Sequence, residues 1–274
     1  MSKPLVTLTT KVGKVTVALV SAVSLVALTA CGSSSDTAAS PGAASTSSTE
    51  VTGTVSVFAA ASLKASFTAI GTAFEKAHPG AKVTFNFGPS SGLATSITQG
   101  NPADVFASAS PTNMDAVVKA GAATGPVTFA KNAMEIGVPT ANPATITALA
   151  DLAKPGTKVA RCADAVPCGK LAIQIFQNAG LTITPVDRPE DVNGVVKDIT
   201  TGEVDAGIVY QTDVLANPAT MKGITIPADV NASTSYPIVA LTKAPNPAGA
   251  KAFTDFVLSS EGVSALTAAG FQKP

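Results

Sequence analysis

Apolar and polar positions follow two different periods along residues 51–274, and the two periods alternate. Apolar residues at every second position predict strands at Val55–Phe58 and Lys82–Phe87, because a half-buried strand turns alternate side chains toward the core. Between Leu63 and Phe74 the apolar residues recur at spacings of four, three and four, which predicts one face of a helix. The helix is expected to end at His78, which Pro and Gly follow directly.

The same alternation continues to the end of the chain. It is typical of an α/β fold with mainly parallel sheets, because each crossover between parallel strands needs a helix. We find no internal repeat. Further strands are expected at 103–106, 135–138, 158–160, 206–209, 224–226 and 238–241, and further helices around 93–97, 114–118, 146–152, 171–176, 192–199, 250–257 and 263–266.

The N-terminal residues differ from this pattern. Three lysines and no acidic residue precede a short apolar run from Val15 to Ala27, and Leu28–Cys31 follows it. A basic start, a short apolar stretch and small residues before a cleavage point predict a secretory signal over residues 1–30. With Cys31 at that point, the segment resembles a bacterial lipoprotein signal, in which the thiol of Cys31 is acylated. A plain secretory signal with an incidental cysteine is the alternative.

Residues 31–50 read as an acylated cysteine followed by a tether. Gly32–Glu50 has no large apolar side chain, so it cannot form a core and is expected to be disordered. It is rich in Ser, Thr, Ala and Gly. A flexible chain of this length spans on the order of 25 Å. The segment would therefore hold the folded part at the outer face of a cell membrane, which makes the predicted location extracytoplasmic and lipid-anchored.

Charge and aromatic content exclude several classes of protein. The chain has 18 basic and 18 acidic residues, and removal of the signal with its three lysines would leave a net charge near −3. A nucleic-acid partner is not expected, because such proteins carry a basic surface. The chain has no Trp and few other aromatic residues, which argues against a surface that stacks sugars or bases.

Two cysteines remain after Cys31. Cys162 and Cys168 bracket a five-residue loop, and in an oxidising compartment we expect them to form a disulfide. Zinc is the rival interpretation, but a structural zinc site needs four ligands and the one histidine, His78, lies far away in the sequence.

Two polar turns between a strand and a helix are candidates for ligand binding, because α/β folds bind ligands at the carboxyl ends of strands. Ser62 stands directly before the helix at Leu63, where an N-cap is expected, and Ser90 lies in the similar turn Phe87–Gly92. Helix N-termini offer free N–H groups and a partial positive charge, and so favour anions. Catalysis is not indicated, because the sequence has no P-loop, HExxH or GxSxG motif.

A series of short motifs resembles the molybdate-binding proteins of ABC importers, in the same order along nearly all of residues 51–274. The resemblance implies a two-lobed, type II periplasmic-binding-protein fold with the ligand cleft between the lobes. It places lobe 1 at 51–131 and 239–274 and lobe 2 at 132–238. The motifs are Val57–Leu63, Phe87–Ala94, Pro102–Phe106, Val166–Gly169, Glu190–Val192, Gly207–Tyr210, Tyr236–Pro237 and Gly270–Phe271.

The resemblance also implies a ligand site and partners. The donors to a tetrahedral dianion would be the hydroxyl and backbone N–H groups of Ser62 and Ser90, the backbone N–H groups of Cys168 and Val192, and the hydroxyl of Tyr210. Molybdate, with tungstate, would bind through its oxygens, without a direct metal ligand and without a cofactor. The expected partner is an ABC permease in the cytoplasmic membrane, and the expected state is a monomer.

Three alternatives stay open at this level. The same transport role could serve another tetrahedral oxyanion such as sulfate. A secreted enzyme on the same fold would show turnover of its bound ligand, and a cell-surface adhesion module would bind no small molecule.

Overall fold

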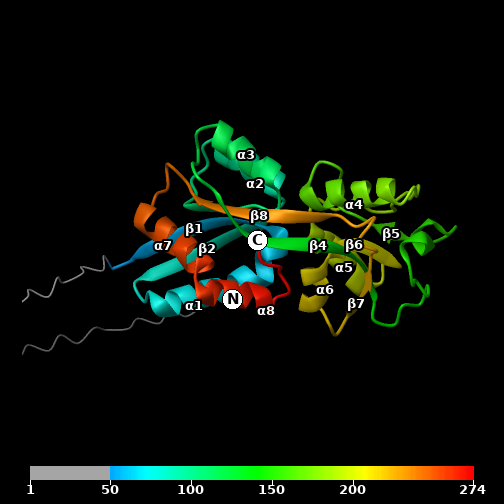
Figure 1. Ribbon diagram of the computed structural model, residues 1–274. Coiled ribbons are helices and arrows are strands. Elements are labelled where there is room, and N and C mark those ends of the chain that lie inside the picture. The colour runs from blue at the N-terminus through cyan, green and yellow to red at the C-terminus, as the bar shows by residue number, and fades with distance from the viewer. Residues whose placement is uncertain (1–49) are drawn as a thin grey trace, which may run out of the picture. The chain divides into compact units, whose positions relative to one another are not determined.

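The computed structural model describes residues 50–274, which form one mixed eight-stranded sheet with helices on both of its faces (Figure 1). The strands follow the order β2-β1-β3-β8-β4-β6-β5, and β7 pairs with β4 beside this path. Their bounds are β1 Gly53–Ala60, β2 Ala81–Gly88, β3 Val105–Ala107, β4 Val127–Pro139, β5 Val159–Ala160, β6 Ala206–Tyr210, β7 Met221–Thr225 and β8 Ser233–Ala240.

The directions of the strands correct one expectation. Strand β1 runs parallel to β2 and β3, and β5 runs parallel to β6. The pairings of β8 with β3 and of β4 with β6, β7 and β8 are antiparallel. The prediction of an α/β fold is therefore confirmed, while the prediction of mainly parallel sheets is wrong. Each antiparallel pair includes β4 or β8, which lie next to each other in the middle of the strand order.

The helices cover both faces of the sheet. In Figure 1, α2 and α3 lie on one side of the left-hand strands and α1 with α8 on the other, and α4 lies opposite α5 and α6 on the right. The helix bounds are α1 Lys64–Ala77, α2 Ser90–Thr98, α3 Pro111–Lys119, α4 Pro167–Asn178, α5 Val192–Thr201, α6 Gln211–Ala216, α7 Pro247–Leu258 and α8 Ser260–Ala268, with 3-10 helices η1 Ala61–Leu63 and η2 Leu149–Ala153.

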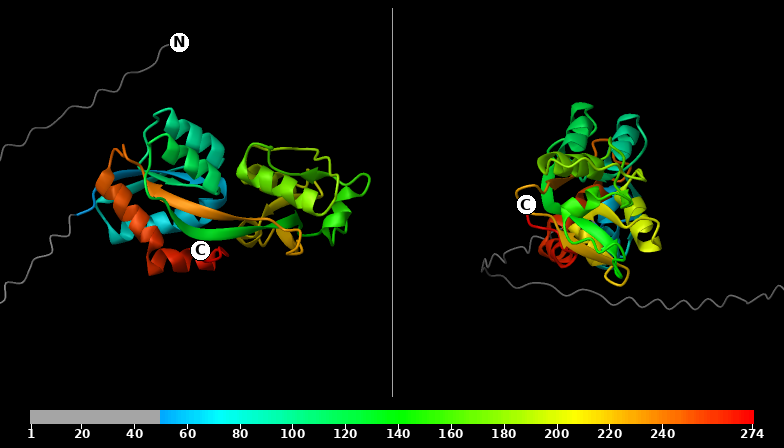
Figure 2. Two further views of the ribbon diagram at one scale, coloured as in Figure 1. Left: turned by 45° about the horizontal axis from the view of Figure 1, so that its top comes forward. Right: turned by 90° about the vertical axis from the view of Figure 1, so that its right-hand side faces the viewer.

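Strand β4 belongs to both halves of the described residues. Its first part, Val127–Ala133, pairs with β8, and its second part pairs with β6 and β7. The left view in Figure 2 shows β4 in green and β8 in orange as they run side by side from the half that contains β1 toward the half that contains β6. The halves are thus joined by sheet hydrogen bonds rather than by a flexible linker.

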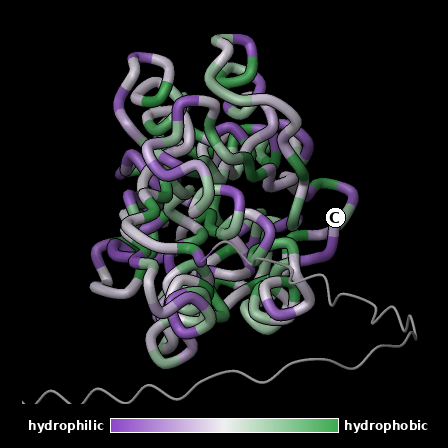
Figure 3. The backbone as a smooth tube through the Cα atoms, turned by 90° about the vertical axis from the view of Figure 1, so that its left-hand side faces the viewer, coloured by the Kyte–Doolittle hydropathy of each residue, from purple (hydrophilic) through white to green (hydrophobic). Residues whose placement is uncertain are grey.

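Buried side chains form separate clusters on either side of this connection. Apart from Ala61, the cluster of the second half is drawn from residues between Met134 and Ala232. The main cluster of the first half uses residues up to Ala130 and again from Tyr236 to Phe271. A third cluster lies under α2 and α3. In Figure 3 hydrophobic stretches gather inside the fold and hydrophilic ones form peripheral turns. The lobe boundaries at 131/132 and 238/239 stay predictions.

Several local predictions are confirmed, and others lie outside the described residues. Helix α1 ends with His78 as its C-cap, and the His78 ring packs on Phe74 at a centroid distance of 4.6 Å. The predicted signal peptide, Cys31 and the tether up to residue 49 are outside the range described. Within residues 50–274, none of the helices combines the length and the apolar character that crossing a membrane requires.

Candidate functional site

A small cavity lies where four helices begin, and all five sequence-predicted donor residues line it. The volume that the centre of a water molecule can occupy inside it is about 20 Å³. Residues from both halves of the fold enclose it: Ala60, Ala61, Ser62, Gly88, Pro89, Ser90 and Ala109 from the first, and Val166, Pro167, Cys168, Asp191, Val192 and Tyr210 from the second. The structure thus brings together residues that are up to 150 positions apart.

Four of these residues offer backbone N–H groups from first turns of helices. Ser62 lies in η1, Ser90 opens α2, Cys168 is the second residue of α4, and Val192 opens α5. The first N–H groups of a helix have no acceptor inside the helix. The backbone N–H groups of these four residues also have no hydrogen-bond acceptor elsewhere among residues 50–274. The cavity is therefore surrounded by uncommitted donors and by the positive ends of helix dipoles.

Ser90 also presents a hydroxyl hydrogen. Its Oγ accepts a hydrogen bond of 2.9 Å from the backbone N–H of Ala109, and the residue is almost completely buried. Because an N–H can only donate, the hydrogen of the Ser90 hydroxyl is left for another acceptor. Ala109 was not identified from the sequence, and an alanine that acts through its main chain gives no signal that could have identified it.

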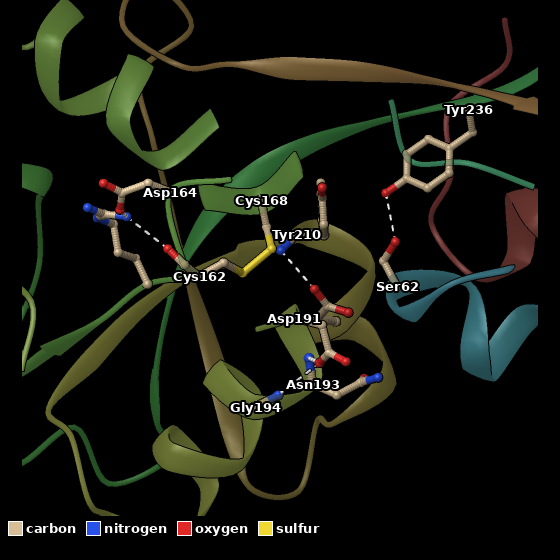
Figure 4. Close-up of a disulfide and its surroundings, with 11 residues drawn as sticks. Ser62, Cys162, Asp164, Cys168, Asp191, Asn193, Gly194, Tyr210 and Tyr236 are labelled. Atoms are coloured by element: carbon tan, nitrogen blue, oxygen red, sulfur yellow. Dashed lines mark hydrogen bonds and ion pairs between the residues drawn. A yellow bond between two sulfur atoms is a disulfide. The ribbon is translucent and has the colours of Figure 1, made fainter. Parts of the chain in front are cut away.

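Ser62 does not act as the predicted helix cap. Its Oγ makes no capping bond to the helix and instead lies 2.9 Å from the hydroxyl oxygen of Tyr236 on β8. Ser62 lies inside η1 rather than before the first helical residue, and its hydroxyl points toward Tyr236 (Figure 4). Tyr236 lies in one of the motifs that resemble the family, but that resemblance implies no role for its side chain.

Tyr210 contributes a hydroxyl that is buried and lacks a hydrogen-bond partner among the described residues. Its ring lies at the end of β6, and its backbone N–H donates to Oδ2 of Asp213 at 2.9 Å. Burial raises the pKa of the Tyr210 phenol well above its usual value, and the neighbouring Tyr236 adds to this shift. The hydroxyl therefore keeps its hydrogen and remains a donor. A buried donor without a partner carries a desolvation cost, and a ligand that accepts a hydrogen bond from it removes this cost.

The cavity lining contains one charged side chain, that of Asp191. No Lys, Arg or His is found among the residues that line it. The carboxylate of Asp191 caps α5 and accepts from the N–H groups of Asn193 and Gly194 at 2.8 and 3.3 Å. This cap satisfies the second and third N–H groups of the helix, and the N–H of Val192 is left free.

The Cys162–Cys168 disulfide is present, as predicted, with a Cα–Cα distance of 5.7 Å. It folds the chain back directly before α4 and lies close to Tyr210 (Figure 4). The buried guanidinium of Arg161 donates to the carbonyl of Cys162 and to Asp164 at 2.8 and 2.7 Å. Pro167 occupies the first position of α4, where its missing N–H costs no helix bond. The loop thus fixes the position of the Cys168 N–H.

The arrangement suits a small anion that accepts hydrogen bonds on all sides. Neutral, oriented donors can hold a charged group without a counter-charge. Within residues 50–274, no group of three or more His, Cys, Asp or Glu side chains is arranged to hold a metal ion. The zinc interpretation of the cysteines therefore finds no support, since both are joined in the disulfide.

Comparison with known proteins assigns this chain to a family. Residues 55–272 match the family model described as Bacterial extracellular solute-binding protein. The chain belongs to this family. Among solute-binding relatives, Molybdate-binding protein ModA of Mycobacterium tuberculosis (strain ATCC 25618 / H37Rv) is 39% identical over 236 residues, which cover 86% of this chain and 90% of the relative.

Two further proteins are similar to this chain. Molybdate-binding protein ModA of Escherichia coli (strain K12) is 33% identical over 80% of this chain and 89% of its own length. The solved periplasmic molybdate-binding protein of Azotobacter vinelandii superimposes with a TM-score of 0.72 at 20% identity, over 80% of this chain and 99% of that one. The solute-binding fold is thus the two-lobed α/β fold that the sequence predicted.

Proposed function

We propose that this protein captures molybdate outside the cytoplasm and delivers it to an ABC importer, and that tungstate binds in the same way. The observation that carries the proposal is the convergence of Ser62, Ser90, Cys168, Val192 and Tyr210 on one cavity. The relatives named as molybdate-binding proteins support the choice of anion.

The energetics are compatible with tight binding. A hydrogen bond to a charged group contributes roughly 1.5–3 kcal/mol. Several such bonds can supply about −8 kcal/mol after the costs of association, which corresponds to a micromolar or lower dissociation constant. Because the donors come from both halves of the fold, bound anion would favour the arrangement in which the halves are close together.

The remaining parts of the proposal are a lipid anchor and a binding role without catalysis. Cys31 would carry the lipid that holds the protein at the membrane, with the residues up to 50 as its tether. The protein would act as a binding protein rather than an enzyme and would use no cofactor. A Cys31→Ser variant recovered from the medium, or retained with its signal uncleaved, would support the anchor.

Calorimetry with molybdate, tungstate and sulfate tests the function. We expect molybdate and tungstate to bind at least about 100-fold tighter than sulfate, a difference near 2.7 kcal/mol. Sulfate is the smaller anion and would leave some of the fixed donors at unfavourable distances. Equal or tighter binding of sulfate would contradict the assignment to molybdate and support the sulfate alternative.

A second test uses Tyr210→Phe. The variant removes a buried hydroxyl that has no partner in the protein, so we expect a slightly higher melting temperature without ligand, corresponding to about 1 kcal/mol. Molybdate should bind roughly 10- to 100-fold more weakly, because one charge-assisted bond is lost. Thermal unfolding and calorimetry on the same samples measure both effects, and unchanged affinity would show that the hydroxyl is not a ligand donor.

A further inference from the structure

The hydroxyl groups of Ser62 and Ser90 share one feature. Each hydroxyl oxygen has a hydrogen-bond partner on the protein side, at 2.9 Å in both cases: the Ala109 N–H for Ser90, and the Tyr236 hydroxyl for Ser62. For Ser90 the direction is fixed, because an N–H can only donate. For Ser62 either hydroxyl could be the donor. The direction in which this second bond runs decides what Ser62 can offer to a ligand.

A fully ionised anion resolves this ambiguity. Such a ligand has no hydrogen to give, so Ser62 can bind it only by donating its single hydroxyl hydrogen. The bond to Tyr236 must then run from the Tyr236 hydroxyl to Ser62 Oγ. Chains of hydrogen bonds polarise one another, so a donor behind Ser62 strengthens the hydrogen bond that Ser62 makes in front.

Tyr236 is held in a manner that suits this task. Its side chain is completely buried on β8, next to β4, where Tyr236 pairs with Ala130. Its ring packs edge-on against Phe271, Phe129 and Tyr210, at centroid distances of 5.3, 6.2 and 6.2 Å. Burial raises the pKa of its phenol, which keeps the hydroxyl hydrogen in place. Tyr236 is not among the residues that line the cavity, so it acts behind Ser62.

We propose that Tyr236 is a positioning residue that commits the Ser62 hydroxyl to donate into the cavity, as the Ala109 N–H does for Ser90. The inference rests on the proposed function, since it concerns the binding of an oxyanion at this site. It adds a residue that does not line the cavity and whose hydroxyl acts on the anion through Ser62.

The test is a double-mutant cycle with Tyr236→Phe and Ser62→Ala, measured by calorimetry with molybdate. We expect Tyr236→Phe to weaken binding about 3- to 10-fold in the parent, and less than twofold when Ser62 is already Ala, because the pathway through Ser62 is then gone. Ser66→Ala is the matched control. It also removes a buried hydroxyl hydrogen bond, to the carbonyl of Leu63, and should leave affinity unchanged.

A second variant guards against a general loss of structure. Incorporation of 3-fluorotyrosine at position 236 keeps the shape and makes the hydroxyl a stronger donor, so molybdate should bind at least as tightly as to the parent. Weaker binding by this variant would overturn the inference. The same holds if Tyr236→Phe has equal effects in both backgrounds, which would indicate a structural role, or no effect at all. If the parent itself binds no oxyanion, the proposed function fails and the inference fails with it.

Discussion

Gly169→Ala is expected to destabilise the protein by about 3–5 kcal/mol and to weaken molybdate binding at least about tenfold. A Cβ at this position would overlap the carbonyl oxygen of Ala163 and would lie 2.8 Å from that of Cys162. Both are main-chain atoms of the loop that the disulfide closes, so neither can swing aside as a flexible side chain would. Helix α4 would have to move, and the Cys168 N–H would move with it.

Gly92→Ala is the matched control for this prediction. Gly92 is the third residue of α2, as Gly169 is the third residue of α4. Its added Cβ would meet one side-chain atom, of Pro89, at an ordinary 3.4 Å. Since Ala favours a helix over Gly, this variant should be neutral or slightly more stable. Chemical denaturation and calorimetry compare the two variants. Equal stability of Gly169→Ala and the parent would contradict the clash.

The free energy of unfolding is expected to fall as pH rises from about 4 to about 7, with Asp213 as a major contributor. Burial raises the pKa of the Asp213 carboxyl from 3.8 to about 7, partly offset by the hydrogen bond from the Tyr210 N–H. A carboxyl with a raised pKa stabilises the folded protein fully below its unfolded value and loses that contribution as pH passes its folded value. The linkage amounts to at most about 4 kcal/mol.

Asp213→Asn isolates this contribution. The amide oxygen can still accept from the Tyr210 N–H, but the side chain cannot ionise, so the variant should lose much of the decline between pH 4 and pH 7. Burial also raises the pKa values of Asp198 and Glu135, but both remain in parent and variant alike. Asp115→Asn, at an exposed position of α3, is the control. Identical pH profiles of the parent and Asp213→Asn would refute the role of Asp213.

Much of the fold was predictable because the spacing of apolar residues within short segments indicates helices and strands. The regular spacing of apolar residues located α1, and the two cysteines that remain in an expected oxidising compartment predicted the disulfide correctly. Strand β4 was predicted only for its second part, because the pairing with β8 shifts register between Thr128 and Ala130. Helix α6 was missed because six residues hold less than two turns of pattern.

The details of the site depended on contacts that no local pattern contains. A serine before an apolar helix is typically a cap, yet the hydroxyl of Ser62 bonds to Tyr236, 174 residues away. The Ala109 N–H that fixes Ser90 lies 19 residues away and carries no side-chain signal. The resemblance to a family named the donors, but only the three-dimensional arrangement indicates how each hydroxyl is oriented.

The division of the buried clusters has a consequence for the order of folding. One cluster draws almost entirely on the continuous stretch from Met134 to Ala232, so that half can assemble soon after its chain is synthesised. The other half needs its last residues: the side chain of Asn246 donates to the carbonyls of Thr52 and Thr54, more than 190 positions earlier. Such distant pairing is slow, because a long loop must close first. A chain that stops before β8 would therefore hold a finished second half beside an incomplete first one, with the donors Ser62 and Ser90 not yet in place.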